Sequence, residues 1–461
     1  MIRWNDRFNT GDVAFILVAS AVQLLIVWPG LIAFYVGVFG RKDLLEVCRQ
    51  FLAVLAAMSI AWCLWANSIA FSPAPGSVPR RDFNTAAPVP DNFQTMMEIE
   101  DAKTDEPDRH GRGGIVGGSD YLNFEGHLPI AGSDRPMFPS RRPVHGIPNL
   151  LILVLHMMLF VAAPAPLLLL MIGRIRPAGV VAFAVLWGSA IYSPLAHWVW
   201  GDGWLETLGV LDCSGGLLHV GVGFSALACA VVLGRQGTCG PTIDLTAADA
   251  PDADASITLF GTLLFWGGTA LLQSALLLHV DGRTVTAFFN SHLAACAGSL
   301  SWVAMSSLVW RRNDRFGICA GAVSGLVAIS PGCGFMGPQS ALITGGVVAA
   351  CTCSTYELLR PKFEGNESLI VFVLQGLAGM GGCFLVGVFA TSSVSGFRWD
   401  HRLIEGAIEG NLNQVAIQAL GFVAAALWGF VGTLLALWII TFSFGRKVAA
   451  SVVAGPPPFS E

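Results

Sequence analysis

The chain consists of long apolar runs separated by short polar linkers. A helix needs about twenty apolar residues to cross a bilayer, and eleven runs of roughly that length occur. Runs this long predict membrane-spanning helices rather than the core of a soluble domain. Because eleven is odd, the two ends of the chain are expected on opposite sides of the membrane. The predicted spans cover residues 13–38, 46–71, 148–172, 178–199, 207–234, 257–279, 284–310, 316–335, 339–358, 366–390 and 414–443.

Basic residues concentrate in every second linker. The linkers that follow odd-numbered spans carry Arg and Lys, and basic linkers of membrane proteins face the cytoplasm. We therefore expect the N-terminus outside and the C-terminus in the cytoplasm, for a protein embedded in the cell (plasma or inner) membrane. The residues that define this pattern are Arg41, Lys42 and Arg49, then Arg174 and Arg176, Arg235, Arg311, Arg312 and Arg315, Arg360 and Lys362, and finally Arg446 and Lys447.

Two polar segments on the outer side are longer than a turn. Residues 72–147 are rich in Pro, Gly and charge, a composition that cannot bury enough apolar surface to fold alone. We expect them to form a long extracytoplasmic loop that is partly disordered, and residues 391–413 to form a short helix over the outer face. Residues 443–461 form a short cytoplasmic tail. The whole chain, 1–461, is therefore interpreted as a single membrane domain.

The overall composition excludes most soluble classes of protein. Of 461 residues, 54% are apolar and only 12% are charged, about half the charged fraction of soluble proteins, and the mean hydropathy is +0.63. The net charge of -5 has the wrong sign for a nucleic-acid surface. The sequence contains no recognisable pair of nucleophile and base, metal-ligand cluster or nucleotide loop, so we expect neither an enzyme nor a bound metal or cofactor.

Ionisable side chains inside the spans are few, and each is a functional candidate because charge is costly in a membrane. His156, His219 and His292 lie within the third, fifth and seventh spans, and Asp212 begins the fifth. A histidine in a packed span also has a structural interpretation, as a hydrogen-bonding link between helices. His219 differs from the others because Gln375 stands at the same depth in the tenth span, and each precedes a run of small residues.

This correspondence predicts an inverted repeat. Spans five and ten are the last members of two sets of five, and an odd number makes the two halves enter the membrane from opposite sides. The substrate path of such proteins lies at the interface of the repeats. His219 and Gln375 are therefore expected to face each other across a pseudo-twofold axis, with the eleventh span as one extra helix.

Five ordered motifs resemble those of the ammonium transporter family, which includes the Amt, Mep and Rh proteins. The resemblance covers nearly all of the chain apart from residues 73–112 and the tail, and it implies an all-helical fold of eleven spans, a homotrimer, and a narrow pore in each protomer. The motifs are the opening span ending in "WPGLIAFYVGVFGRKDLL", "YSPLAHWVWG" at 192–201, "H-x-x-x-G-x-x-A-L" from 219, "GLVAISPGCGFMGP" at 325–338, and "G-x-x-x-x-G-V-F-A" ending at 390.

The resemblance also implies roles for residues near the outer mouth. Trp200 matches an external cation site, where an indole face attracts a small cation, although tryptophan at a membrane surface is also a common anchor. Leu276 stands where a serine assists that site. Leu159 and Leu272 stand where two stacked phenylalanines cap the pore, and Gln273 follows directly as a further candidate for the pore lining.

Deeper positions match only in part. Asp212 matches the acidic residue that starts the fifth span, with a structural or cation-stabilising role, but the run from it to His219 is one residue shorter than is typical. His219 matches the first of two pore histidines, and Gln375 replaces the second. The acidic pair before that second position is reduced to Asn366 and Glu367. Because a glutamine amide does not titrate near neutral pH, a proton cannot be shared here as it is between two imidazoles.

The function implied is a membrane channel or transporter for ammonium or ammonia. It would recruit the cation at an external vestibule and pass the neutral form through a largely apolar pore. Two alternatives are an ammonium sensor with little flux and a channel for another small neutral solute, as in the Rh branch. The expected partners are ammonium or ammonia, the lipid bilayer and other copies of the chain, and no nucleic acid. A PII-type regulator is not expected, because residues 443–461 are too few.

Overall fold

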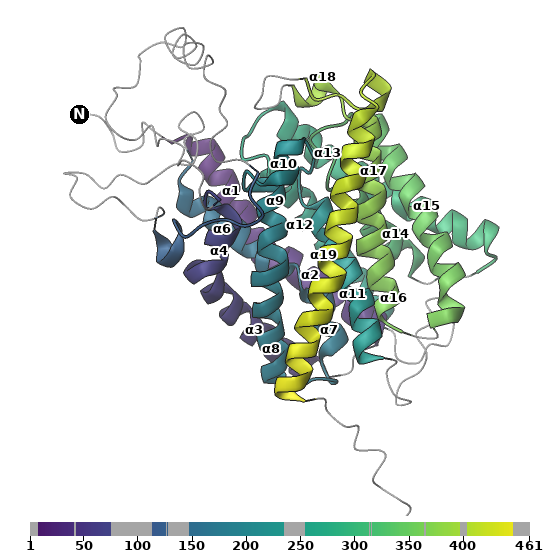
Figure 1. The fold of residues 1–461 in the computed structure, drawn as a ribbon. Coiled ribbons are helices and arrows are strands. Elements are labelled where there is room, and N and C mark those ends of the chain that lie inside the picture. Colours follow the sequence, from purple (N-terminus) through teal and green to yellow (C-terminus); the bar gives the residue numbers. More distant parts are fainter. Residues whose placement is uncertain are drawn as a thin grey trace, which may run out of the picture.

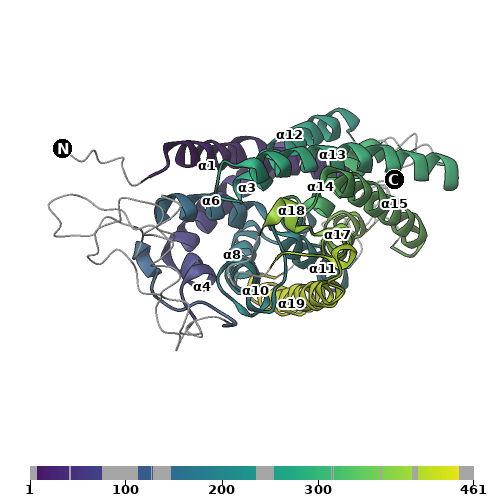
Figure 2. The same ribbon diagram turned by 90° about the horizontal axis from the view of Figure 1, so that it is seen from above.

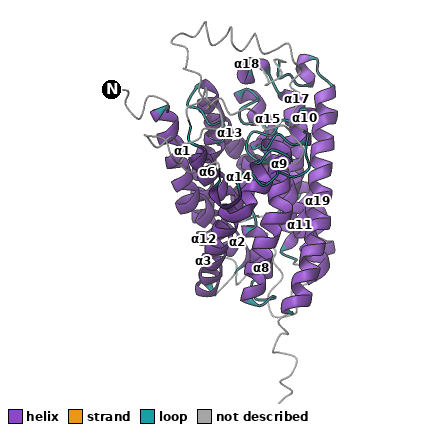
Figure 3. Ribbon diagram, turned by 60° about the vertical axis from the view of Figure 1, so that its left-hand side comes forward, coloured by secondary structure: helices purple, strands orange, loops and turns teal. Residues whose placement is uncertain are grey.

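The computed structural model is a bundle of long helices (Figures 1 and 3). It describes residues 8–40, 43–74, 113–125, 127, 147–234, 254–312, 314, 316–363, 366–396 and 403–445. Within these residues, ten helical segments are long and apolar enough to cross a membrane, and one shorter apolar helix covers Gly317–Ile329. No strand is formed in the described part of the chain. The predicted all-α membrane architecture is confirmed, and these ten segments and the shorter helix follow the order of the eleven predicted spans.

The first five spans contain both straight and interrupted helices. Two short helices lie outside the spans, η3 (Leu122–Phe124) and α10 (Trp204–Leu208). The spans themselves are built from α1 (Thr10–Val22), η1 (Gln23–Val27) and α2 (Trp28–Phe39); α3 (Leu44–Ala61), η2 (Trp62–Ala66) and α4 (Asn67–Phe71); α6 (Asn149–Ala162) and α7 (Ala165–Met171); α8 (Pro177–Trp187), η4 (Gly188–Tyr192) and α9 (Ser193–Trp200); and α11 (Gly216–Leu233).

The remaining six spans end with the longest helix of the bundle, α19, which runs along its full height in Figure 1. In place of the single short helix predicted for residues 391–413, the described part of that segment forms two, α18 (Ser392–Ser395) and η7 (Ala407–Glu409). The spans are α12 (Ala255–Ala275); α13 (Gly282–Ala304) and η5 (Met305–Val309); α14 (Gly317–Ile329); α15 (Pro338–Phe363); α16 (Ser368–Val371), η6 (Phe372–Leu377) and α17 (Ala378–Phe389); and α19 (Asn413–Phe444).

Several spans contain a π-helical turn, and proline explains two of these turns. Pro29 follows η1 and Pro194 follows η4, each as the second residue of the next helix. Proline has no amide hydrogen for the carbonyl one turn earlier, so the helix widens before it. Pro331 similarly ends the eighth span early, because α14 stops at Ile329 and the chain continues as turns up to Phe335.

Close glycine contacts bring the central helices together. Figure 2 shows α11, α17 and α19 side by side. At the crossing of α11 with η6, a Cβ atom on Gly223 would lie 2.1 Å from the backbone nitrogen of Gly376. A second crossing brings α12 against α2, where a Cβ on Gly261 would lie 2.3 Å from the nitrogen of Phe34. Small residues at such crossings let helix backbones approach in a membrane.

Part of the segment between spans two and three is folded against the bundle. The Trp198 indole donates to the carbonyl of Ile115 at 2.7 Å, and the Ser68 hydroxyl donates to the carbonyl of Gly118 at 2.9 Å. These bonds attach residues 113–125 to spans two and four. Most of the predicted loop 72–147, and most of the predicted tail 443–461, lie outside the described residues.

Candidate functional site

His219 and Gln375 meet where the fifth and tenth spans cross. Nδ1 of His219, on α11, lies 2.6 Å from Oε1 of Gln375, on η6. The crossing of Gly223 with Gly376 supplies the close approach, because Gly376 directly follows Gln375 and Gly223 lies one turn beyond His219. The π-helical turn containing Gln375 is a type of irregularity often found at functional sites.

Tyr35 extends this pair into a chain of three side chains. The Gln375 amide nitrogen donates to the Tyr35 hydroxyl at 3.2 Å, and both side chains are buried. With its nitrogen facing Tyr35, the amide presents its oxygen to His219, so Nδ1 of the imidazole carries the proton and Nε2 is left as an acceptor. Sequence reasoning did not identify Tyr35. A buried tyrosine hydroxyl in an apolar span needs a polar partner, and this was the available signal.

Trp200 lies at the end of α9 with its ring orientation held by one hydrogen bond. The indole Nε1 donates to the backbone carbonyl of Asp212 at 3.0 Å. The ring is partly exposed, whereas most of α9 is buried. Its neighbours are aromatic, since the ring centroid of His156 lies 5.3 Å away. The ring therefore offers an oriented π face at the C-terminal end of the fourth span.

The Asp212 carboxylate holds the start of α11. Its Oδ1 accepts from the amides of Gly215 at 2.7 Å and Gly216 at 2.8 Å, and its Oδ2 accepts from the amide of Leu217 at 2.8 Å. The turn requires glycine at residue 215, because the backbone there has a φ of +93°. An anionic side chain at a helix N-terminus is favourable both as a cap and for the helix dipole. This geometry favours the structural role predicted for Asp212.

Gln418 holds the residue that precedes Asp212. Its side-chain oxygen accepts from the amide of Leu211 and its nitrogen donates to the carbonyl of the same residue, both at 2.8 Å. Such a two-sided amide contact fixes the backbone as a neighbouring strand would. Because Asp212 positions both Trp200 and α11, this clamp from α19 supports the Trp200 ring and the start of α11 together. The sequence offered no pattern that pointed to it.

The three leucines expected at the outer mouth belong to one apolar cluster. Leu272 is buried within it, and Leu159 and Leu276 pack against it from α6 and the end of α12. The Gln273 side chain, in contrast, forms hydrogen bonds with neighbouring helices. Its amide nitrogen donates to the Leu326 carbonyl at 2.9 Å and to the Ser330 hydroxyl at 2.8 Å, while its oxygen accepts from the Ser291 hydroxyl at 2.5 Å. These bonds connect α12 to α13 and α14, so the contacts favour a packing role for Gln273.

An ion pair joins the end of span three to the start of span ten. Nη2 of Arg174 lies 3.3 Å from Oε2 of Glu367, and both side chains are largely buried. Arg174 also donates to the carbonyl of Gly234, at the end of α11, at 3.4 Å. The acidic residue retained before the tenth span therefore pairs with a basic residue of span three.

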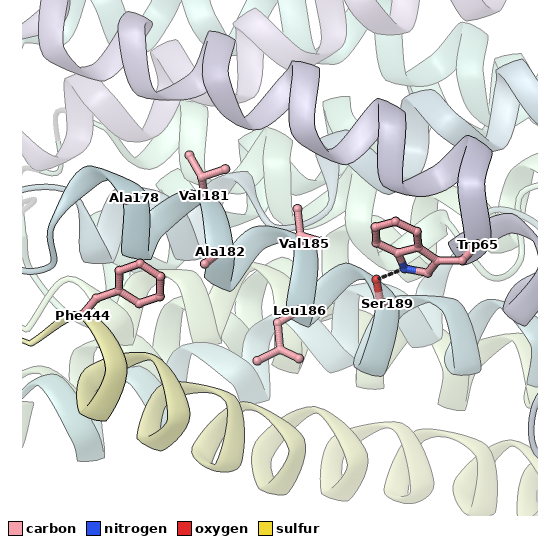
Figure 4. Close-up of a pocket in the computed structure, with 8 residues that line it drawn as sticks. All are labelled: Trp65, Ala178, Val181, Ala182, Val185, Leu186, Ser189 and Phe444. Atoms are coloured by element: carbon pink, nitrogen blue, oxygen red, sulfur yellow. Dashed lines mark hydrogen bonds between the residues drawn. The ribbon is translucent and has the colours of Figure 1, made fainter.

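A separate groove on the side of the bundle does not suit a cation. It has a volume of about 790 Å³ and is lined by α8, by Trp65 and by Phe444 (Figure 4). Most of the lining is aliphatic. Its two polar side chains bond to each other, since the Trp65 indole donates to the Ser189 hydroxyl at 2.9 Å. A site for a small polar solute instead needs convergent polar groups.

Comparison with known proteins agrees with this arrangement. The chain is 28% identical over 437 residues to an ammonium transporter of Bacillus subtilis, covering 94% of this chain and 92% of that protein. It is 26% identical over 444 residues to an ammonium transporter of Aquifex aeolicus, covering 96% and 90%. The crystal structure of Candida albicans Mep2 has the same fold, with a TM-score of 0.78 at 23% identity over 98% of this chain and 89% of that chain. The model of the Ammonium Transporter Family matches residues 130–452, which is more than half of the sequence, and the chain therefore belongs to this family.

Proposed function

We propose that this protein is a membrane channel or transporter for ammonium, with Trp200 at its outer recruitment site and His219 with Gln375 in its pore. The observation that carries the proposal is the 2.6 Å contact between His219 and Gln375, at the crossing of the fifth and tenth spans of a chain in this family. We assign the oriented indole of Trp200 to the outer cation site, and the apolar cluster around Leu272 to an apolar plug of the pore.

The apolar surroundings determine which form of the substrate crosses. An unpaired charge in such a pore costs far more than a neutral solute that can form hydrogen bonds. Ammonium therefore leaves its proton at the outer side, and ammonia crosses. Nε2 of His219 accepts an N–H of ammonia, and the Gln375 amide holds the imidazole in that tautomer. Because Gln375 does not titrate, the pair relays no proton and the native protein moves little net charge.

Replacement of Trp200 tests the recruitment step. A cation–π contact contributes about 0.5–2 kcal/mol, so Trp200→Leu should raise the half-saturating ammonium concentration from a few-fold to about thirtyfold. Trp204→Leu is the matched control, because Trp204 lies near the same end of the bundle and packs edge-on against Trp198 at 5.5 Å. Flux is measured in proteoliposomes after a pulse of ammonium, methylammonium or potassium. If Trp200→Leu and Trp204→Leu had the same half-saturating ammonium concentration, Trp200 would be a membrane anchor and not a recruitment site.

The same experiment separates transport from sensing. A sensor binds ammonium with little flux, whereas the proposed channel alkalinises the vesicle lumen after an external pulse, because ammonia that enters takes up a proton there. Saturable flux that depends on Trp200 supports the channel, and binding without flux contradicts it. Flux of an unrelated neutral solute at equal rate would indicate a less selective pore.

We further propose that residues 1–461 form one domain of a homotrimer in the cell membrane, with the N-terminus and the 72–147 segment outside and the 443–461 tail in the cytoplasm. No PII-type partner is proposed. The alternation of basic linkers along the predicted spans supports the topology, and the trimer is what membership of the family implies. Single cysteines introduced at Lys103 and Val453 should react with an impermeant maleimide from opposite sides. Labelling from one side alone would contradict this topology, and a monomer after cross-linking would contradict the trimer.

A further inference from the structure

His156 shares the outer site with Trp200. Its imidazole, on α6, lies with its centroid 5.3 Å from the Trp200 ring and 4.5 Å from the Phe71 ring, and it is 6% exposed. The interplanar angle with Trp200 is 57°, so neither ring covers the other in a parallel stack. Leu159, on the same helix, lies one turn further along and packs against the apolar cluster that contains Leu272.

We propose that His156 and Trp200 together form a two-part ammonium site, in which the indole face attracts the cation and the neutral imidazole accepts one of its N–H groups. This inference rests on the recruitment role proposed for Trp200. The site is selective because a cation–π contact attracts any small cation, whereas only a cation with N–H groups can donate to an imidazole. Ammonium is therefore favoured over potassium.

The same geometry makes external protons competitors of ammonium. A neutral imidazole has one acceptor nitrogen, but a protonated imidazole has none and carries a positive charge. A charge placed beside the Trp200 ring repels a second cation that approaches its face. Binding of ammonium to His156 and protonation of the same imidazole therefore exclude each other, without any change in the fold.

The other titratable groups described on the elements near α6 either contact a partner other than His156 or lie at the far end of a span. The Asp212 carboxylate accepts hydrogen bonds from the amides that start α11, and the Glu206 carboxylate of α10 accepts from the amide of Asp202. The rest are Asp12 on α1, which accepts from the amide of Val280; Cys63 on η2, which faces Met157; Tyr192 on η4, which packs on Phe160; His197 on α9, which contacts the Ala70 carbonyl; and Glu46, Cys48 and Arg49 at the far end of span two, on α3.

The test is the pH dependence of half-saturation in proteoliposomes. If protonation of His156 competes with ammonium, half-saturation of the native protein should rise as the external pH is lowered from about 7.5 to about 5.5. In His156→Gln, which keeps an acceptor but cannot titrate, it should be flat over this range. His156→Leu should lose discrimination between ammonium and potassium. His292→Gln is the matched control, because His292 also lies beside a tryptophan within a span, 5.5 Å from Trp266, and should retain the native response.

A second readout does not depend on flux. In protein with ¹⁵N-labelled histidine, the His156 ring signal should move towards its neutral form when ammonium is added at mildly acidic pH, and this response should vanish in Trp200→Leu. A flat native profile, an unchanged response in His156→Gln, or a His156 signal insensitive to ammonium overturns the inference. Transport that still depends on Trp200 would then leave the proposed function standing. Saturable flux that no longer depends on Trp200 would overturn its recruitment role and, with it, this inference.

Discussion

Gly223→Ala should separate the helices that carry His219 and Gln375. A Cβ at residue 223 would lie 2.1 Å from the nitrogen and 2.2 Å from the Cα of Gly376, and these are backbone atoms that cannot rotate away. To reach an ordinary contact distance of 3.4 Å, the two backbones must move apart by about 1.3 Å. A displacement of this size along the 2.6 Å contact between His219 and Gln375 lengthens it to about 3.9 Å, which is no longer a hydrogen bond.

The expected cost has two measurable parts. Overpacking destabilises by about 1–3 kcal/mol, and the better helix propensity of alanine offsets about 1 kcal/mol of this. Loss of one buried hydrogen bond should lower the ammonium flux from a few-fold to about tenfold. Gly267→Ala is the matched control, because Gly267 is exposed on α12 and a Cβ there meets no atom within 4 Å. The same chemical change should there be neutral or slightly stabilising.

Thermal unfolding in detergent and ammonium flux in proteoliposomes measure the two parts separately. Gly223→Ala should unfold at a lower temperature than Gly267→Ala and conduct less ammonium per protomer. If the two variants unfold together and conduct equally, the crossing of α11 and η6 is looser than the structure indicates. The argument that this crossing positions the pore pair would then be refuted.

Three further predictions concern other parts of the protein. Gln375→His creates a titratable pair with His219 and should produce an ammonium-driven current that the native protein lacks; a robust native current that survives His219→Ala would contradict this mechanism. Burial raises the pKa of Asp314 to about 6, despite its bond to the Trp302 indole, so its ionisation opposes folding and stability is lost as pH rises from about 4 through about 6. The unfolding temperature of the native protein should therefore fall, relative to Asp314→Asn, across that range, and parallel profiles would contradict the assignment. Gln418→Leu removes the clamp on Leu211 and leaves two buried backbone groups unpaired, at about 1–3 kcal/mol each, so the midpoint of thermal unfolding should drop clearly below that of the native protein.

Hydropathy alone determined the architecture of this protein. A bilayer requires long apolar runs whose backbone hydrogen bonds are satisfied internally, so the eleven runs had to be helices. The same reasoning could not find where spans bend, and it extended the eighth span to residue 335 although α14 ends at Ile329. Hydropathy indicates which residues are buried in lipid, and it does not predict where a proline or a π-helical turn bends or ends a helix.

The pairing of His219 with Gln375 was predictable because each is a polar residue at the same depth, one in the fifth predicted span and one in the tenth. Their contact depends on helix crossing, and the sequence could suggest it only through the small residues that follow. Tyr35 and Gln418 were not predictable in this way. They come from spans one and eleven, and only packing brings them to the site.

Tertiary structure alone decided what the residues expected at the outer mouth contact. The sequence singled out His156 and Trp200 separately, but they lie on different spans, and only the fold places their rings 5.3 Å apart. It also decided that the Asp212 carboxylate binds the amides of α11 and that Gln273 connects three helices. The physical reason is that hydropathy determines which residues enter the membrane, whereas the partner of each polar group depends on rotation and crossing of the helices, which are set by close packing of small side chains.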